Sequence, residues 1–514
     1  MSKTIIIIGA GLAGLSAALQ AAENGCNVKL VSSFPSERAQ SVMAEGGINA
    51  ALNTKDENDS PEEHFTDTIK AACGLADPNA VWGMTQAAPE LVHWLLKLGV
   101  KFNMSGYDDV DLRNFGGQKK KRTAFAQSDT GKQIMTAMID AVRRKEASGM
   151  VERFSHHSFL TLRLCDNICC GCVIRDEYSQ KTVELPGDAV IVATGGMHGL
   201  FGNTTGSLSN TGEVTAELFR LGVPLANGEM IQYHPTTVKC GGKRMLISEA
   251  ARGEGGRLFA MKDGKQWYFM EEKYPELGNL MPRDITAREI WKVSHESEVF
   301  LDMTEISDEI ISNKLSGLAD DCMTYLHKDI RKEPVSVLPG IHYFMGGILV
   351  DEQHRTPIQN LYAAGECCAQ YHGANRLGGN SLLGALYGGR VAAKSACEQA
   401  DVVDLSCATQ IDFPPASQIS EIKQLNKVMQ ETMGVVRNEN TLLNGIQTVQ
   451  ALTGNLPLLG MAVLKSALAR KESRGAHWRE DYPKSNDDDY LKTTVARFDG
   501  KQIQISFVPV PERR

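Results

Sequence analysis

A glycine-rich turn close to the start of the chain limits most strongly which folds the chain can adopt. Ile5–Ile8 is a short apolar run, and Gly9-Ala10-Gly11-Leu12-Ala13-Gly14 follows it directly. The residues from 15 to 23 read as a helix, and those from 27 to 31 as a second strand. This order is typical of a parallel sheet that binds a dinucleotide. The glycines let the backbone approach a pyrophosphate, and the helix N-terminus offers N–H donors.

Two further apolar strands end in glycine turns much later in the chain. Ala189–Val192 leads into Ala193-Thr194-Gly195-Gly196, and residues 360–364 lead into Gly365-Glu366. The sequence therefore predicts a nucleotide-binding sheet that starts at the N-terminus, is completed near residue 365 and is interrupted by an inserted domain. Contacts from several strand ends suit FAD better than the shorter NAD. Ser32 ends the second strand where an acidic residue usually holds the ribose, and its hydroxyl can make that contact.

Size and charge narrow the class of protein. A chain of 514 residues predicts two or three domains, and a net charge of -8 argues against non-specific nucleic-acid binding. We expect a cytoplasmic protein. The apolar N-terminal run is too short for a secretory signal, and the most apolar C-terminal stretch, Leu456–Ala469, is too short to span a bilayer.

Four of the 12 cysteines cluster between Cys165 and Cys172. A metal or iron–sulfur site is one interpretation. The other is a hairpin over residues 161–175 that turns at Asp166-Asn167 and packs its cysteines as small apolar residues. We favour the hairpin and predict no metal site.

Many motifs along the chain occur in the order of one known family. They are Gly9–Gly14, Ala44-Glu45-Gly46-Gly47, Phe115-Gly116-Gly117, Arg122-Thr123, Ala193–Gly196, Gln232-Tyr233-His234-Pro235-Thr236, residues 249–255, Pro282-Arg283-Asp284, residues 342–347, residues 372–382 and residues 472–477. On these residues the chain resembles the flavoprotein subunits of fumarate reductase and succinate dehydrogenase, and their relative L-aspartate oxidase.

The resemblance implies an α/β fold with a Rossmann-like FAD-binding domain, split by an inserted α+β capping domain and followed by a helical C-terminal domain. The expected boundaries are 1–231 and 343–410 for the two parts of the FAD-binding domain, 232–342 for the capping domain and 411–514 for the C-terminal domain. The last domain is expected to start at Phe413-Pro414-Pro415. Helical spacing marks residues 419–436, 442–452 and, after a break at Pro457, 458–470. An edge strand is expected at Gln502–Val510.

The resemblance also implies the site residues. The catalytic group comprises Arg283 as proton donor with Arg252 and Glu249 as its relay. Without the resemblance, the spacing of Glu249 and Arg252 favours an ordinary helical ion pair, and Arg283 would not be chosen as a proton donor because Arg is normally a poor acid. The expected substrate-binding residues are His234, Ser248, His342, Arg376 and Phe115. The expected cofactor-binding residues are Gly9, Gly11, Gly14, Ser32, Ala44, Glu45, Gly46, Gly47, Thr194, Gly195, Glu366, Ser381 and Leu382, the last two opening a helix that ends at Gly388-Gly389.

Two departures from the family pattern decide between relatives. Many members carry a His in Arg-Ser-His-Thr that bonds to the flavin, whereas the matching run here is Arg38-Ala39-Gln40-Ser41. We therefore expect non-covalent FAD and, as in relatives without the bond, fumarate reduction rather than the succinate dehydrogenase direction. L-Aspartate oxidase has Glu-Gly-Gly-His-Ser where this chain has Phe115–Lys119, so no acid receives an ammonium, and Lys119–Arg122 would repel one.

Several alternatives stay open on the sequence alone. They are an L-aspartate oxidase, a reductase of another enoate, and an electron-transfer or scaffold subunit without a substrate site. Electrons must reach the flavin from a partner, and the resemblance implies an iron–sulfur subunit, with membrane attachment only through partners. The physiology implied is electron transport in anaerobic respiration.

Overall fold

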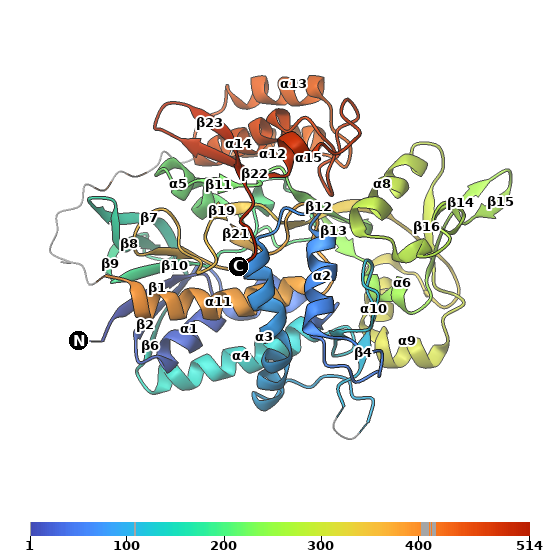
Figure 1. Ribbon diagram of the computed structural model, residues 1–514, viewed down its shortest axis with the longest axis horizontal. Helices are drawn as coiled ribbons and strands as arrows, with labels where there is room; N and C mark the ends of the chain where they lie inside the picture. The colour runs from blue at the N-terminus through green and yellow to red at the C-terminus, as the bar shows by residue number, and fades with distance from the viewer. Residues whose placement is uncertain (1, 107–108, 402–410, 412, 414–417) are drawn as a thin grey trace.

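The computed structural model describes residues 2–106, 109–401, 411, 413 and 418–514. Figure 1 shows three groups of elements. The N-terminal elements and α11 form one group, the elements of residues 231–344 form a second, and the last helices lie above the first group. This α/β arrangement confirms the predicted fold class.

The central sheet is parallel, and its strands come from segments far apart in the sequence. Its order is β20-β10-β1-β2-β6. The side chains of Ile5 to Ile8 are at most 3% exposed, because helices and a second sheet cover both faces. The prediction of a sheet started at the N-terminus and completed near residue 365 is confirmed. The strands are β1 (Thr4–Ile8), β2 (Asn27–Ser32), β6 (Val151–Ser155), β10 (Ala189–Val192) and β20 (Leu361–Ala363).

Helices α1 (Leu12–Glu23) and α11 (Asn380–Gln399) pack side by side against one face of this sheet (Figure 1). Ser16 Oγ donates a hydrogen bond to the Leu386 carbonyl at 2.7 Å. The prediction that α11 ends at Gly388-Gly389 is wrong. The helix continues to Gln399. Gly389 lies at a close approach of the two helices, since a Cβ there would be 2.3 Å from the Ala13 carbonyl oxygen.

The other face of the sheet carries an antiparallel sheet that contains the predicted cysteine hairpin. Asp166 and Asn167 form its turn with positive φ angles of 47° and 66°, as their side chains tolerate. Cys169 and Cys172 are fully buried in the apolar core. Within the described part of the chain, no group of three or more His, Cys, Asp or Glu residues is placed to hold a metal ion. The strands are β7 (His157–Cys165), β8 (Ile168–Asp176) and β9 (Thr182–Pro186).

Residues 231–344, the inserted segment, build two small sheets with helices around them, and most of these elements lie to the right in Figure 1. One sheet has the order β13-β12-β18 and the other β15-β14-β16-β17. The strands are β12 (Ile231–Cys240), β13 (Lys243–Leu246), β14 (Arg257–Lys262), β15 (Lys265–Trp267), β16 (Val299–Asp302), β17 (Val335–Ser336) and β18 (Leu338–Phe344). The helices are α6 (Glu249–Gly253), α7 (Phe269–Lys273), α8 (Arg283–Val293), α9 (Asp308–Lys314) and α10 (Ser316–Asp321).

The C-terminal region contains the three predicted helices with shifted ends. They are α12 (Ile419–Thr432), α13 (Glu439–Val449) and α14 (Asn455–Ala469). The predicted break at Pro457 is wrong, because Pro457 lies in the first turn of α14, where a proline costs no helical hydrogen bond. The expected start of this region at Phe413-Pro414-Pro415 lies mostly outside the described residues. Residues 487–490 form the short helix α15 (Asp487–Tyr490).

The chain ends in a hairpin that joins a mixed sheet of order β21-β19-β11-β22-β23. The last strand lies at the edge, as predicted. No helix among the described residues is long and apolar enough to cross a membrane. The strands of this sheet are β11 (Leu225–Ala226), β19 (Gly347–Leu349), β21 (Cys368–Ala369), β22 (Lys492–Phe498) and β23 (Ile503–Pro509). The remaining elements are α2 (Pro61–Ala71), α3 (Pro78–Lys97), α4 (Thr130–Ala147), α5 (Glu213–Arg220), β3 (Ile48–Asn49), β4 (Leu112–Arg113) and β5 (Thr123–Ala124).

Candidate active site

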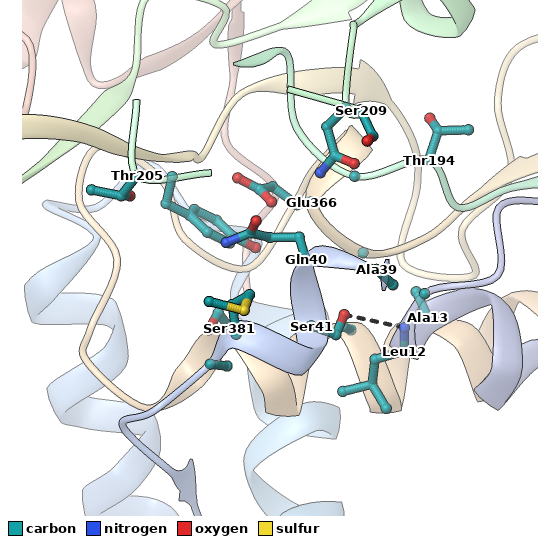
Figure 2. A pocket seen from close by; sticks show the side chains of 18 of the residues that line it. Leu12, Ala13, Ala39, Gln40, Ser41, Thr194, Thr205, Ser209, Glu366 and Ser381 are labelled. Carbon is teal, nitrogen blue, oxygen red and sulfur yellow. Dashed lines mark hydrogen bonds between the residues drawn. The ribbon is translucent and has the colours of Figure 1, made fainter. Parts of the chain in front are cut away.

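A cavity of about 600 Å³ runs along the carboxyl ends of the central strands and under the inserted segment. Its walls include the turns after β1, β10 and β20, the first turns of α1 and α11, and residues of β12, β18 and α8. Figure 2 shows Thr194, Glu366 and Ser381 around it, from three different strand or helix ends. Helix N-termini meeting at strand ends form the place where doubly wound sheets bind nucleotides.

The first glycine turn has the close backbone packing that its sequence predicts. Gly9 has φ +111°, and a Cβ on Gly14 would lie 1.8 Å from the Gly9 carbonyl oxygen. Ser32 Oγ lies at the cavity wall, is buried and finds no hydrogen-bond partner in the described part of the chain. A buried hydroxyl without a partner is unfavourable unless a ligand satisfies it, so this end of the cavity fits a ribose hydroxyl.

The turns after β10 and β20 place a carboxyl group in the middle of the cavity. Glu366 Oε1 accepts a hydrogen bond from the Phe344 N–H at 3.1 Å. Burial raises the pKa of Glu366 to about 7, so close to neutral pH it is able both to donate and to accept a hydrogen bond. Thr194 and Gly195 line the same wall. These groups fit the hydroxyl-rich chain that joins the two ends of FAD.

The first turn of α11 and the segment after β2 face each other across the cavity. Ser381 and Leu382 line it from α11. Gln40 lines it from the 3₁₀ turn of residues 40–43, beside Ala39 and Ser41 (Figure 2). The predicted segment Ala44–Gly47 follows directly, and burial, with Asp321 nearby, raises the pKa of Glu45 to about 8. The neutral carboxyl group of Glu45 therefore predominates at neutral pH.

At the inserted segment the structure brings the predicted catalytic group together. Arg283, the first residue of α8, donates from Nε to Glu249 Oε2 at 2.8 Å and from Nη2 at 2.5 Å. Arg252 Nη2 lies 3.4 Å from Glu249 Oε1, one helical turn along α6. Burial would raise the pKa of Glu249, but Arg283 and Arg252 outweigh burial and hold it below its ordinary value. Glu249 is therefore an ionised carboxylate between two guanidinium groups.

Arg376 is a buried cation at the wall of the cavity. Its side chain lies over the Tyr343 ring at 4.3 Å, and its Nε has no hydrogen-bond partner among the residues that the structure describes. Within the described residues no ion pair involves Arg376, although only 2% of the residue is exposed. Burial, helped by the nearby Arg283, lowers the pKa of Arg376 to about 9. A guanidinium in this state is completed by an anion that enters the cavity.

Two histidines stand beside these arginines on neighbouring antiparallel strands. The rings of His234 and His342 are 5.1 Å apart between centroids, and His342 Nδ1 hydrogen-bonds to Thr205 Oγ1 at 2.8 Å. Burial first and the charge of Arg283 second hold the pKa of both rings well below the ordinary value. The imidazoles are therefore neutral hydrogen-bonding groups. Ser248 also lines the cavity, and its Oγ caps α6 by accepting from the Ala250 N–H at 3.4 Å.

Phe115 stands at the position where L-aspartate oxidase has an acidic residue for the substrate ammonium. Its ring is 2% exposed and lines the cavity, and a Cβ on Gly46 would lie 3.0 Å from it. The repulsion of an ammonium by the basic run 119–122 stays a prediction. Those residues do not line the cavity, and Lys120 pairs with Glu63 at 2.6 Å while Arg122 pairs with Asp59 at 2.8 Å.

Sequence reasoning missed several residues that position the site. Ser41 Oγ accepts from the Leu12 N–H at 3.2 Å, the contact dashed in Figure 2. Gln232 accepts from Arg283 Nη1 at 3.1 Å and donates to the Arg376 carbonyl at 2.8 Å. Gln232 stood within a quoted motif and could have been found there. Thr205 had no signal, because only the tertiary fold brings it to His342.

The comparisons with known proteins agree with this geometry. The model of the FAD binding domain matches residues 4–382, and the model of the fumarate reductase flavoprotein C-terminal region matches residues 452–513. The cavity and the match define an FAD-dependent oxidoreductase. The chain belongs to the family of flavoprotein subunits of succinate dehydrogenase and fumarate reductase, which also includes L-aspartate oxidase.

Individual relatives carry different names within this family. The chain is 38% identical to the succinate dehydrogenase flavoprotein subunit of Bacillus subtilis, over 100% of this chain and 98% of that protein. It is 33% identical to an L-aspartate oxidase of Pyrococcus furiosus, over 94% of this chain and 97% of the relative. A structure of E. coli quinol fumarate reductase superposes with a TM-score of 0.90 at 27% identity, covering 99% of this chain and 97% of that chain.

Proposed function

We propose that this chain is the flavoprotein subunit of a fumarate reductase, which converts fumarate to succinate. The observation that carries the proposal is the charge of the buried group at the inserted segment. Arg252, Arg283 and Arg376 supply three positive charges, and among the described residues Glu249 is the one carboxylate paired with any of them. A dicarboxylate dianion would balance the remaining two charges. A dicarboxylate that also carries an ammonium would leave one positive charge of the site unbalanced.

The two ends of the dianion would be held differently. Arg376 offers a planar fork that matches one carboxylate, with the neutral ring of His342 beside it. His234 and Ser248 would receive the other carboxylate from β12 and the start of α6. Phe115 supplies an apolar wall, which keeps water from the carbon–carbon bond and strengthens the charged contacts.

Proton delivery is assigned to Arg283. Fumarate gains a hydride on one carbon and a proton on the other, and reduced FAD supplies the hydride when it is bound. Arg283 Nη1 contacts Gln232 and Arg283 Nη2 contacts Glu249. A proton given up by the Arg283 guanidinium would be replaced by one that the Glu249 carboxylate first accepts from Arg252 and then passes on. Arg252 on the far side of Glu249 donates to the Asn279 carbonyl at 2.6 Å and completes the relay.

The direction of the reaction is assigned from Gln40. An amide side chain is not a nucleophile that bonds to the flavin methyl group, so FAD is held non-covalently. The covalent bond in relatives raises the flavin potential, and its loss favours reduction of fumarate. The first turn of α11, at Ser381 and Leu382, would place its positive end toward the flavin and stabilise the reduced anion.

The substrate assignment is tested by oxidation of the reduced flavin. The FAD-loaded chain, reduced anaerobically with reduced viologen, should reoxidise rapidly when fumarate is added, and succinate should reduce the oxidised protein more slowly. L-Aspartate with oxygen is the parallel assay. Turnover of aspartate with no response to fumarate would assign the chain to the oxidases, and succinate oxidation as fast as fumarate reduction would overturn the direction.

The state of the flavin is tested separately. Acid precipitation of the FAD-loaded chain should leave essentially all of the flavin in the supernatant, because nothing at position 40 retains it. The measurement is the flavin absorbance of supernatant and pellet. A Gln40→Ala variant should give the same partition, whereas a fluorescent flavin peptide in the pellet would contradict the assignment.

Partners and domain limits complete the proposal. Relatives are named subunits, which supports an iron–sulfur electron donor and attachment to a membrane, if any, through partners. The domain boundaries at residues 231, 342 and 410 are part of the proposal. The change to small sheets at β12 and the return to the central sheet at β20 support them.

A further inference from the structure

Two thiols that the proposed chemistry does not use lie in contact at the far side of the FAD-binding domain. Cys26 Sγ and Cys397 Sγ are 2.9 Å apart, although the residues are 371 positions apart in the sequence. Cys26 is 5% exposed and stands between the end of α1 and the start of β2. Cys397 is partly exposed and lies in the last turn of α11.

The place of this pair gives it a link to the cofactor site. Helices α1 and α11 both present their first turns to the cavity, at Leu12 and Ser381. They then pack together along their length through Ser16 and Gly389. The two thiols lie at the opposite ends of these helices, away from the cavity. The N-terminal segment is close by, since Lys3 Nζ donates to the Cys397 carbonyl at 2.8 Å.

We propose that Cys26 and Cys397 form a redox-active dithiol whose oxidation to a disulfide fastens α1 to α11 and slows the loss of FAD. The oxidant is a low-molecular-weight disulfide. It first forms a mixed disulfide with the more exposed Cys397 and releases one small thiol. The Cys26 sulfur then attacks Cys397, the second small thiol leaves, and the two protein S–H protons and two electrons pass to the two thiols.

The geometry needs little adjustment for this bond. A disulfide has its sulfurs about 2.05 Å apart, so these two must move closer by less than about 1 Å. Closing so long a loop strongly restricts the conformations of the unfolded chain. The bond also opposes separation of α1 and α11, whose first turns line the cavity. Burial raises the pKa of the Cys397 thiol, so the exchange is slow and requires hours of oxidising conditions.

The test uses the FAD-loaded full chain. It is first reduced with dithiothreitol under anaerobic conditions, then desalted and incubated for hours in oxidised or reduced glutathione. Free thiols are alkylated, and the digest is searched by mass spectrometry for a Cys26 peptide joined to a Cys397 peptide. The same samples give the melting temperature and the rate of FAD loss into buffer that contains an apoflavoprotein trap.

Oxidation should produce the joined peptide, raise the melting temperature by about 3–5 °C and slow FAD loss about 3- to 10-fold. Dithiothreitol should reverse all three effects. Cys397→Ser should lose them, and Cys73→Ser, a substitution at another partly exposed thiol, should keep them. Glutathione attached to Cys397 without a joined peptide would overturn the proposal, as would a joined peptide with neither shift.

The slower loss of FAD rests on the non-covalent binding proposed above, and the readouts separate the two. If acid precipitation finds a covalent flavin, the joined peptide and the melting temperature still decide the dithiol. If the flavin is non-covalent and no joined peptide forms, the dithiol alone is wrong.

Discussion

Replacement of Arg283 by alanine should lower the rate of fumarate reduction by about 10³-fold, equivalent to about 4 kcal/mol in the activation barrier. Arg283 is 6% exposed, and its guanidinium contacts both Gln232 and the Glu249 carboxylate. Its loss removes the proposed proton donor and leaves Glu249 without its closest partner. Reoxidation of the reduced protein by fumarate measures the rate, and substrate saturation separates kcat from KM.

Two controls separate chemistry from folding. Breaking a buried ion pair costs about 3–5 kcal/mol of stability, so the melting temperature of Arg283→Ala should fall. Arg283→Lys keeps a positive charge beside Glu249 and should recover part of the stability without the activity, because an ammonium lacks the planar fork that contacts Glu249 and Gln232 together. Arg288→Ala changes an arginine of the same helix that stacks on Trp478 at 4.0 Å, away from the cavity, and should keep the activity. A normal kcat in Arg283→Ala would remove Arg283 from the proton path.

The fold could be read from the sequence where local pattern and tertiary contact agree. The fully apolar run Ile5–Ile8 followed by glycines permits few structures other than a buried parallel strand and a tight turn. The end of α11 was misread because Gly388 and Gly389 are helix breakers in isolation. Their place in the structure depends on α1 and His354, which approach from distant parts of the chain. Pro457 was misread for a simpler reason, since a proline within the first helical turn removes no hydrogen bond.

Some residues of the site could be predicted from local sequence, and others could not, because their approach depends on distant parts of the chain. Glu249 and Arg252 are one helical turn apart, so their pairing follows from local geometry. The approach of Arg283 and Arg376 to the same cavity depends on α8 and the loop before α11, and only the family resemblance supplied it. The basic run at residues 119–122 shows the opposite case. Lys120, Lys121 and Arg122 look free in the sequence, but they are paired with Glu63, Glu57 and Asp59, which other turns bring to them.

Replacement of Gly14 by alanine should abolish FAD binding or reduce FAD affinity by more than about 10-fold, with a loss of stability above about 3 kcal/mol. The added Cβ would lie 1.8 Å from the Gly9 carbonyl oxygen and 2.9 Å from its carbonyl carbon. Both are backbone atoms of the turn between β1 and α1, so no side chain is able to rotate away. The helix must move off the strand, and its first turn then leaves the cofactor.

The matched control for this variant is Gly242→Ala, in the turn between β12 and β13, where an added Cβ meets no atom within 4 Å. It should keep full FAD content and an unchanged melting temperature, as measured by the ratio of flavin to protein absorbance and by thermal unfolding. A Gly14→Ala protein that binds FAD as tightly as the parent would show that the turn relaxes without moving α1. The close approach of Gly14 to the Gly9 backbone would then not be needed to bind the pyrophosphate. Loss of FAD in Gly14→Ala alone ties cofactor binding to that approach, because the two variants add the same methyl group and differ only in what surrounds it.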